Sequence, residues 1–166
     1  MPDEIFEIVD ADGNVLGLRS RAEVHQDPSL LHKVAHVLVF NESGELLLQR
    51  RSMNKDVEPG KWDTSVGGHV SPGEDIKAAA FREMEEELGI SCNDMDFLYS
   101  YIFSGRHESE LVFSYRCTHN GPFTYNVEEI DAVAFWRLDD ILNTLGCGTL
   151  SLNFEAEIRK YLSVRP

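Results

Sequence analysis

The stretch GHVSPGEDIKAAAFREMEEELGI, residues 68–90, decides how the whole chain is interpreted. Its middle predicts a helix, because three successive alanines are strong helix formers and Asp75 suits the positive end of a helix dipole. Gly89 supplies the left-handed residue at which helices commonly end. The predicted helix runs directly out of a glycine-containing loop, so its side chains should have fixed positions relative to that loop.

Three glutamates share one side of this helix. At about 100° per residue, Glu83, Glu86 and Glu87 lie in one sector, away from the apolar stripe. Like charges at this spacing repel by a few tenths of a kcal/mol per pair, so a cation nearby is expected to offset the repulsion. Mg²⁺ takes carboxylate oxygens and shares its remaining positions with substrate phosphates, whereas a merely solvated acidic face is the plainer alternative. The pattern favours a Mg²⁺ site, with Mn²⁺ as the alternative ion.

The glycine and polar positions of this stretch resemble the complete signature of the Nudix hydrolase family. The matching residues are Gly68, Glu74, Arg82, Glu83, Glu86, Glu87, Gly89 and Ile90, with Met84 where the family pattern more often has a branched aliphatic residue. The resemblance implies an α/β/α sandwich with a mixed sheet and hydrolysis of a diphosphate bond. It implies that the three glutamates of the helix sector serve in catalysis and metal binding, with the Gly68 carbonyl as a further candidate ligand.

The same resemblance gives Arg82 a structural role. It implies that Arg82 bonds back to Glu74 and fixes the loop against the helix, for which a planar guanidinium is well suited. The alternative is a helix-surface ion pair, worth about 0 to 1 kcal/mol.

Composition restricts the classes of partner. The chain has 166 residues, 42% of them apolar, and a formal net charge of −14, which argues against a broad nucleic-acid footprint. It contains no apolar run long enough for a membrane span and begins with an acidic segment, so we expect a soluble, cytoplasmic protein with no membrane partner. Three cysteines without paired spacing predict reduced thiols. The expected partner is a small-molecule diphosphate, and a homodimer is left open.

Hydrophobic patterns and turn residues predict strands on both sides of the central helix. The expected strands span 5–9, 15–18, 32–40, 45–51, 62–66, 95–104, 110–117 and 130–138, and the expected late helices span 139–145 and 151–162. Such an order predicts an α/β fold in which helices cover a mixed sheet. Because no repeat or linker interrupts the chain, residues 1–166 are expected to form a single Nudix hydrolase domain.

Arg50, Arg51 and Lys55 are candidates for binding the substrate. They lie on and just after a predicted strand, in a protein with few cations. Arginine offers two parallel hydrogen bonds to a phosphate and lysine a point charge. Solvated charges at a sheet edge are the alternative.

The segment from His25 through Gly73 also resembles the isopentenyl-diphosphate isomerase branch of the same superfamily. That resemblance implies a second metal site made by His25, His32, His69, Glu108 and Glu110. The isomerase additionally needs a proton-transferring cysteine just before the glycine and histidine of the loop, where this chain has Gly67. The branch also tends to have an incomplete form of the signature that is complete here.

The leading hypothesis is therefore a Mg²⁺-dependent Nudix hydrolase that cleaves a diphosphate bond in a nucleoside diphosphate derivative or a related organic diphosphate. One glutamate of the helix, or an acid outside it, would be the general base. The alternatives are an isopentenyl-diphosphate isomerase-like protein and a non-catalytic nucleotide-binding module.

Overall fold

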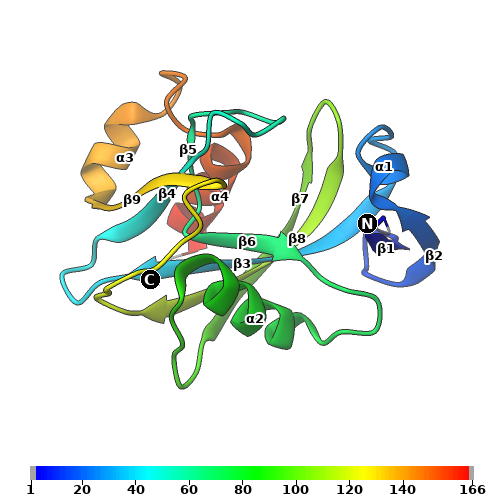
Figure 1. Ribbon diagram of the computed structural model, residues 1–166, viewed down its shortest axis with the longest axis horizontal. Coiled ribbons are helices and arrows are strands. Elements are labelled where there is room, and N and C mark those ends of the chain that lie inside the picture. Colours follow the sequence, from blue (N-terminus) through cyan, green and yellow to red (C-terminus); the bar gives the residue numbers. More distant parts are fainter. Residues whose placement is uncertain (1–2, 165–166) are drawn as a thin grey trace.

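The computed structural model describes residues 3–164, and Figure 1 shows their arrangement. The strands are β1 (Ile5–Val9), β2 (Val15–Ser20), β3 (Leu31–Phe40), β4 (Leu46–Arg51), β5 (Trp62–Asp63), β6 (Val66–His69), β7 (Asp96–Ser104), β8 (Ser109–Thr118) and β9 (Ile130–Trp136). The helices are α1 (Arg21–Val24), α2 (Ile76–Leu88), α3 (Leu138–Thr144) and α4 (Leu152–Val164).

Strand β3 lies at the centre of a mixed sheet (Figure 1). It pairs in parallel with β8 along its whole length and antiparallel with β6. The β1–β2 hairpin joins at the start of β3, where Ile8 lies opposite His32. Strand β4 pairs with β3 only where Leu46 lies opposite Phe40, and then turns away to pair with β5 and β9.

Helices cover both faces of this sheet. Alternate side chains of β3 point to opposite faces, so Val37 packs with Met84 of α2 while Leu38 packs with Phe154 of α4. These two contacts belong to separate buried clusters, one under α2 and one under α3 and α4. The arrangement is the α/β/α sandwich with a mixed sheet that the sequence predicts.

The central helix begins and ends where its sequence indicates. The Asp75 side chain caps the N-terminus of α2 by accepting a hydrogen bond from the Ala78 N–H at 3.1 Å. Gly89 ends the helix with φ of 65°, in the left-handed region that glycine adopts without steric cost. Ala80, Met84 and Leu88 are buried, and Glu83 and Glu87 lie beside this apolar stripe, where both are partly buried.

The prediction of one strand at 62–66 is wrong, because this segment contributes to two strands, β5 and β6. Residues 62 and 63 pair with β4, whereas Val66–His69 pair with β3. Ser65 lies between them, with its Oγ donating to the Leu47 carbonyl and accepting from the Val39 N–H at 3.0 Å. The change of partner strand carries the chain from one part of the sheet to another. The strand expected at 130–138 is also too long, because Leu138 already begins α3.

The sequence analysis missed α1, although its signal is present. Ser20 and Glu23 form a reciprocal capping box: the Ser20 side chain accepts from the Glu23 N–H at 3.3 Å, and the Glu23 carboxylate accepts from the Ser20 N–H at 2.8 Å. This short helix ends at His25, whose position matters for the site described below.

None of the helices within residues 3–164 is long and apolar enough to cross a membrane. Cys92, Cys117 and Cys147 are all unpaired thiols, as the cysteine count predicts.

Candidate active site

Gly68, in strand β6, lies directly against a glutamate of helix α2. A Cβ added at Gly68 would overlap the Cγ, Cδ and Oε2 atoms of Glu83. Only glycine therefore allows the backbone to approach this carboxylate so closely. The contact places the Gly68 backbone and Glu83 together, as the predicted metal site requires.

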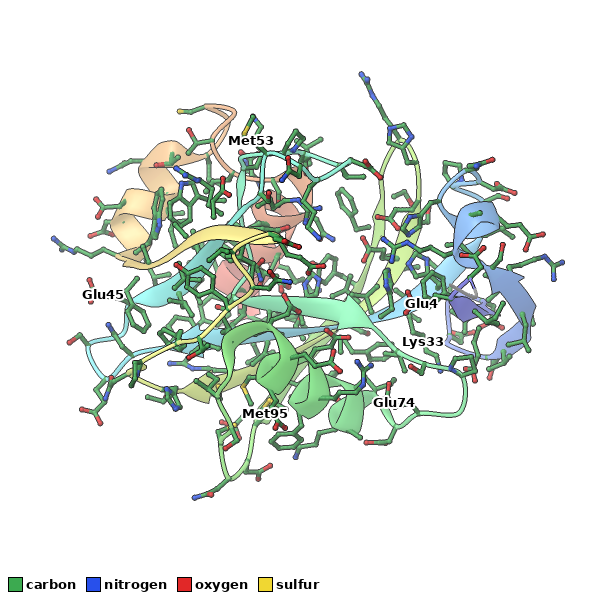
Figure 2. All side chains as sticks on the ribbon, in the orientation of Figure 1. Glu4, Lys33, Glu45, Met53, Glu74 and Met95 are labelled. Carbon is green, nitrogen blue, oxygen red and sulfur yellow. The ribbon has the colours of Figure 1, made fainter. Side chains whose placement is uncertain are left out.

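Arg82 holds the loop to the helix. Its Nε and Nη2 donate to the two oxygens of Glu74, each at 2.9 Å, and Nη2 also donates to the His69 carbonyl at 3.1 Å. Its Nη1 donates to Glu83 at 2.7 Å and to Glu86 at 3.2 Å. Figure 2 shows Glu74 at the end of α2 where the loop arrives. The bonds from Arg82 hold the pKa of Glu74 below its usual range. The guanidinium thus makes the loop contact implied by the resemblance and also orients two helix glutamates.

Glu87 is held by groups on two strands. Gln49 of β4 donates to its Oε1 at 2.9 Å, and the Gly67 N–H of β6 donates to its Oε2 at 3.2 Å. Burial raises the pKa of Glu87 to about 8 and also raises the pKa of Glu83, against the opposing effect of these donors and of Arg82. Two neighbouring carboxylates whose charged forms are disfavoured provide the donor set that a divalent cation stabilises. No pattern in the sequence indicates this role of Gln49.

The three basic candidates do not gather around the glutamates. Arg50 lies 3.7 Å from Asp131, and Lys55 lies 3.7 Å from Glu129. Arg51 donates to Asp63 at 3.2 Å and to the Val57 carbonyl at 2.9 Å. Each has an acidic partner of its own, so their role in binding substrate stays a prediction.

A second group of metal-ligand side chains lies at the other end of β6. One ligand atom each from His25, His32, His69 and Glu108 falls within 4.8 Å of the others. They come from the end of α1, from β3, from the last residue of β6 and from the turn before β8. Four of the five residues predicted for a second metal site are thus brought together by segments far apart in the chain.

The polar atoms of this group are unsatisfied. His25 Nε2 lies 2.9 Å from Glu108 Oε2, but neither atom makes a hydrogen bond of acceptable geometry. Both ring nitrogens of His32 are also buried without a partner. Burial, followed by the charge of His25, lowers the pKa of His32 to about 4. Burial also lowers the pKa of His69 well below its usual value. The lowered pKa values favour neutral imidazoles at His32 and His69, and the neutral imidazole is the form that binds a metal.

Glu110 lies outside this four-residue group. Its Oε1 accepts a hydrogen bond from Asn153 of α4 at 3.3 Å. Burial, followed by the charge of Glu108, raises the pKa of Glu110 to about 7. Four of the five predicted ligands therefore lie together. That Glu110 is the fifth ligand stays a prediction.

A surface cleft of about 400 Å³ has two members of this group, His25 and Glu108, in its wall, together with Arg21 and Asp56. The two candidate centres are connected by consecutive residues of β6, because Gly67 and Gly68 contact the helix glutamates while His69 joins the histidine group.

Proteins named as Nudix hydrolases and proteins named as isopentenyl-diphosphate isomerases both resemble this chain in sequence. An uncharacterised Nudix hydrolase of Yersinia pestis is 36% identical over 140 residues, which cover 83% of this chain and 75% of that protein. An isopentenyl-diphosphate Delta-isomerase of Streptomyces avermitilis is 42% identical over 137 residues, covering 79% and 70%. The crystal structure of DR0079 from Deinococcus radiodurans superposes with a TM-score of 0.82 at 23% identity, covering 95% of this chain and 98% of the other.

A family model described as the NUDIX domain matches residues 30–153. That span begins before β3 and ends in α4, so it includes the central sheet, the glycine loop and the glutamate helix. With the geometry of Gly68, Arg82 and Glu87 described above, this match shows that the chain belongs to the Nudix family.

Proposed function

We propose that this protein is a divalent-metal-dependent hydrolase that cleaves a diphosphate bond in a nucleoside diphosphate derivative or a related organic diphosphate, and that residues 1–166 form one such domain. Nudix hydrolases in general cleave diphosphate bonds of small molecules with the help of divalent metals. The observation that carries the proposal is the contact of Gly68 with Glu83 beside the partly buried Glu87. It is the arrangement that a carboxylate-bound cation needs.

Each residue of the helix site has a role in this proposal. Glu83, Glu86 and Glu87, with the Gly68 carbonyl, would hold Mg²⁺ or Mn²⁺. Such an ion, when bound, screens the diphosphate charge, polarises a phosphorus–oxygen bond and lowers the pKa of an attacking water. The general base is one of these glutamates or an acid outside the helix. Glu110 is the candidate outside it, because a pKa of about 7 suits that task.

A screen of diphosphates tests this function and separates it from isomerisation. The isomerase alternative has support from the histidine group and from relatives of that name, but residue 67 is a glycine and has no thiol to transfer a proton. With Mg²⁺ or Mn²⁺, we expect hydrolysis of at least one compound among nucleotide sugars, dinucleoside polyphosphates, nucleoside triphosphates and prenyl diphosphates. Isopentenyl diphosphate in heavy water should gain no deuterium above background.

The outcomes of that screen are distinct. Metal-dependent deuterium exchange at enzyme-like rates would show that the isomerase alternative is correct and the hydrolase proposal wrong. Binding of a nucleotide without any turnover would support a non-catalytic module, against which the complete set of helix carboxylates argues.

We further propose that His25, His32, His69 and Glu108 bind a second divalent metal. Neutral imidazoles with one carboxylate suit Zn²⁺ or Mn²⁺ better than Mg²⁺. Replacing His25 by Gln should weaken binding of that ion by more than the roughly 10- to 100-fold that loss of an outer-shell partner costs. His107→Gln, which changes an exposed neighbour outside the group, should leave it unchanged. Titration with Mn²⁺ measures the affinity of the wild type and of both variants, and anomalous scattering then locates the bound ion. Equal stoichiometry and affinity in the wild type and His25→Gln would contradict the site.

A further inference from the structure

A buried histidine and glutamate lie behind the strand that carries the glycine loop. His36 is on β3, where it pairs with Gly67 of β6 and with Ser114 of β8. Its Nδ1 lies 3.1 Å from an oxygen of Glu157, which projects from α4 and is fully buried. No role for either residue was predicted from the sequence, and neither makes a hydrogen bond to Glu83, Glu86 or Glu87 within residues 3–164.

Glu157 is fully occupied as an acceptor. The Tyr99 hydroxyl donates to it at 2.9 Å, and the Ser114 hydroxyl donates to it at 2.9 Å. With His36 Nδ1–H as a third donor, these bonds suit an ionised carboxylate, which can only accept. Burial by itself lowers the pKa of His36, but the hydrogen bond and charge of Glu157 raise it overall. The contact with Glu157 therefore holds the ring in one orientation, and the raised pKa favours the imidazolium, the form in which Nε2 also carries a proton.

The free side of this ring faces Gly67. A Cβ added at Gly67 would lie 3.0 Å from His36 Cδ2, 3.1 Å from His36 Nε2 and 3.5 Å from Thr64 Cγ2. Within residues 3–164, His36 Nε2 makes no hydrogen bond, and the residue as a whole is 5% exposed. The Thr64 hydroxyl, on the other side chain that borders this glycine, is buried and has no partner either. Thr64 borders Gly67 with its methyl group, and its hydroxyl, like His36 Nε2, lacks the partner that such a polar group normally has.

Gly67 connects this pair of groups to the helix site, because its N–H donates to Glu87 at 3.2 Å. We propose that His36 Nε2–H donates a hydrogen bond to a non-bridging oxygen of the substrate diphosphate, with the Thr64 hydroxyl as a second contact and Glu157 as the residue that positions the imidazolium. This subsite rests on the proposed function for the class of its ligand. The arginines and the lysine considered earlier have acidic partners elsewhere, whereas His36 Nε2 has no hydrogen-bond partner and is a donor suited to an anion when the ring is protonated.

Two substitutions separate the roles of the two ring nitrogens. His36→Asn keeps a donor near the position of Nδ1, facing Glu157, but has nothing at the position of Nε2. His36→Gln reaches the position of Nε2. His119→Asn is the matched control, because His119 lies beyond β8 and its Nδ1 accepts from the nearby Gly121 N–H. The probe is methylene diphosphonate with Mg²⁺, an analogue that cannot be cleaved, and calorimetry gives its Kd.

We expect His36→Asn to weaken diphosphonate binding by about tenfold or more, the cost of losing a charged hydrogen bond. His36→Gln should fall between His36→Asn and the wild type, and His119→Asn should match the wild type. Equal Kd values for the wild type and His36→Asn would overturn the proposal, as would a wild type that does not bind the probe. Should His36→Asn not fold, the NMR signal of the His36 ring in the wild type gives the answer, because absence of a shift on adding the probe is equally contrary.

The result can be read independently of the proposed function. A wild type that hydrolyses diphosphates while His36→Asn keeps its affinity removes the subsite and leaves the hydrolase. A wild type that cleaves none of the screened compounds but binds the diphosphonate through His36 keeps the subsite and removes the hydrolase.

Discussion

Replacing Glu87 by Gln should lower kcat by on the order of 10²-fold or more while the fold is kept, because charge stabilisation at a metal site is lost. The amide has nearly the same size as the carboxylate, and its oxygen can still accept from Gln49 or from the Gly67 N–H, which hold Glu87 at 2.9 and 3.2 Å. What changes is the negative charge that a cation needs. Steady-state kinetics at saturating Mg²⁺, on whichever diphosphate the screen identifies, measures the effect.

The matched control is Glu85→Gln on the same helix. Glu85 is exposed, and no side-chain hydrogen bond or ion pair joins it to the rest of residues 3–164. It should keep wild-type kcat and thermal stability. Wild-type turnover by Glu87→Gln, or turnover that persists in excess chelator, would refute the role given to this glutamate.

The parts of the fold that were predictable from sequence depend on neighbours in the chain. The limits of α2 follow from Asp75 and Gly89, whose capping roles require only residues within one turn. The directions of Glu83 and Glu87 relative to each other are likewise local, because helix pitch fixes them, whereas the approach of Gly68 to Glu83 depends on how the loop is held to the helix by Arg82. Even the missed helix α1 has a local signal, the Ser20 and Glu23 capping box.

The features that sequence could not supply depend on pairing across the sheet. The division of 62–66 into β5 and β6 arises because the two halves pair with different strands, β4 and β3. The support of Glu87 by Gln49 requires β4 to lie beside the end of α2, and no periodicity within β4 indicates that. The histidine group was predictable in part. Its members were predicted from a resemblance, but only the packing of α1 against the sheet shows which four lie together.

The same contrast applies to the charges. Arg50 and Arg51 are adjacent in sequence, yet they have separate acidic partners, Asp131 and Asp63. Glu157 lies on a predicted helix face among apolar residues, where its hydrogen bonds to β3, β7 and β8 could not be foreseen. Its burial is favourable only because three donors meet it, and these come from three different strands.

Gly68→Ala should lower kcat/KM by about 10²-fold, because a displacement of about 1 Å in a catalytic group has a cost of this size. The added methyl would overlap the carboxylate end of Glu83. That end is flexible, so the side chain can rotate away and the protein should still fold. In doing so, Glu83 leaves Arg82 Nη1, to which it bonds at 2.7 Å, and leaves the position next to the Gly68 carbonyl.

Gly17→Ala is the matched control for this substitution. Gly17 also lies in a strand, its added Cβ would meet only Arg19 Nη1 at 3.7 Å, and its strand β2 is remote from the helix glutamates. Both variants should melt cooperatively, and only Gly68→Ala should lose activity and affinity for Mg²⁺. If Gly68→Ala keeps wild-type kcat/KM, close approach of this backbone to Glu83 is not needed for the reaction. If instead it loses activity but binds Mg²⁺ normally, the glycine serves the substrate rather than the metal.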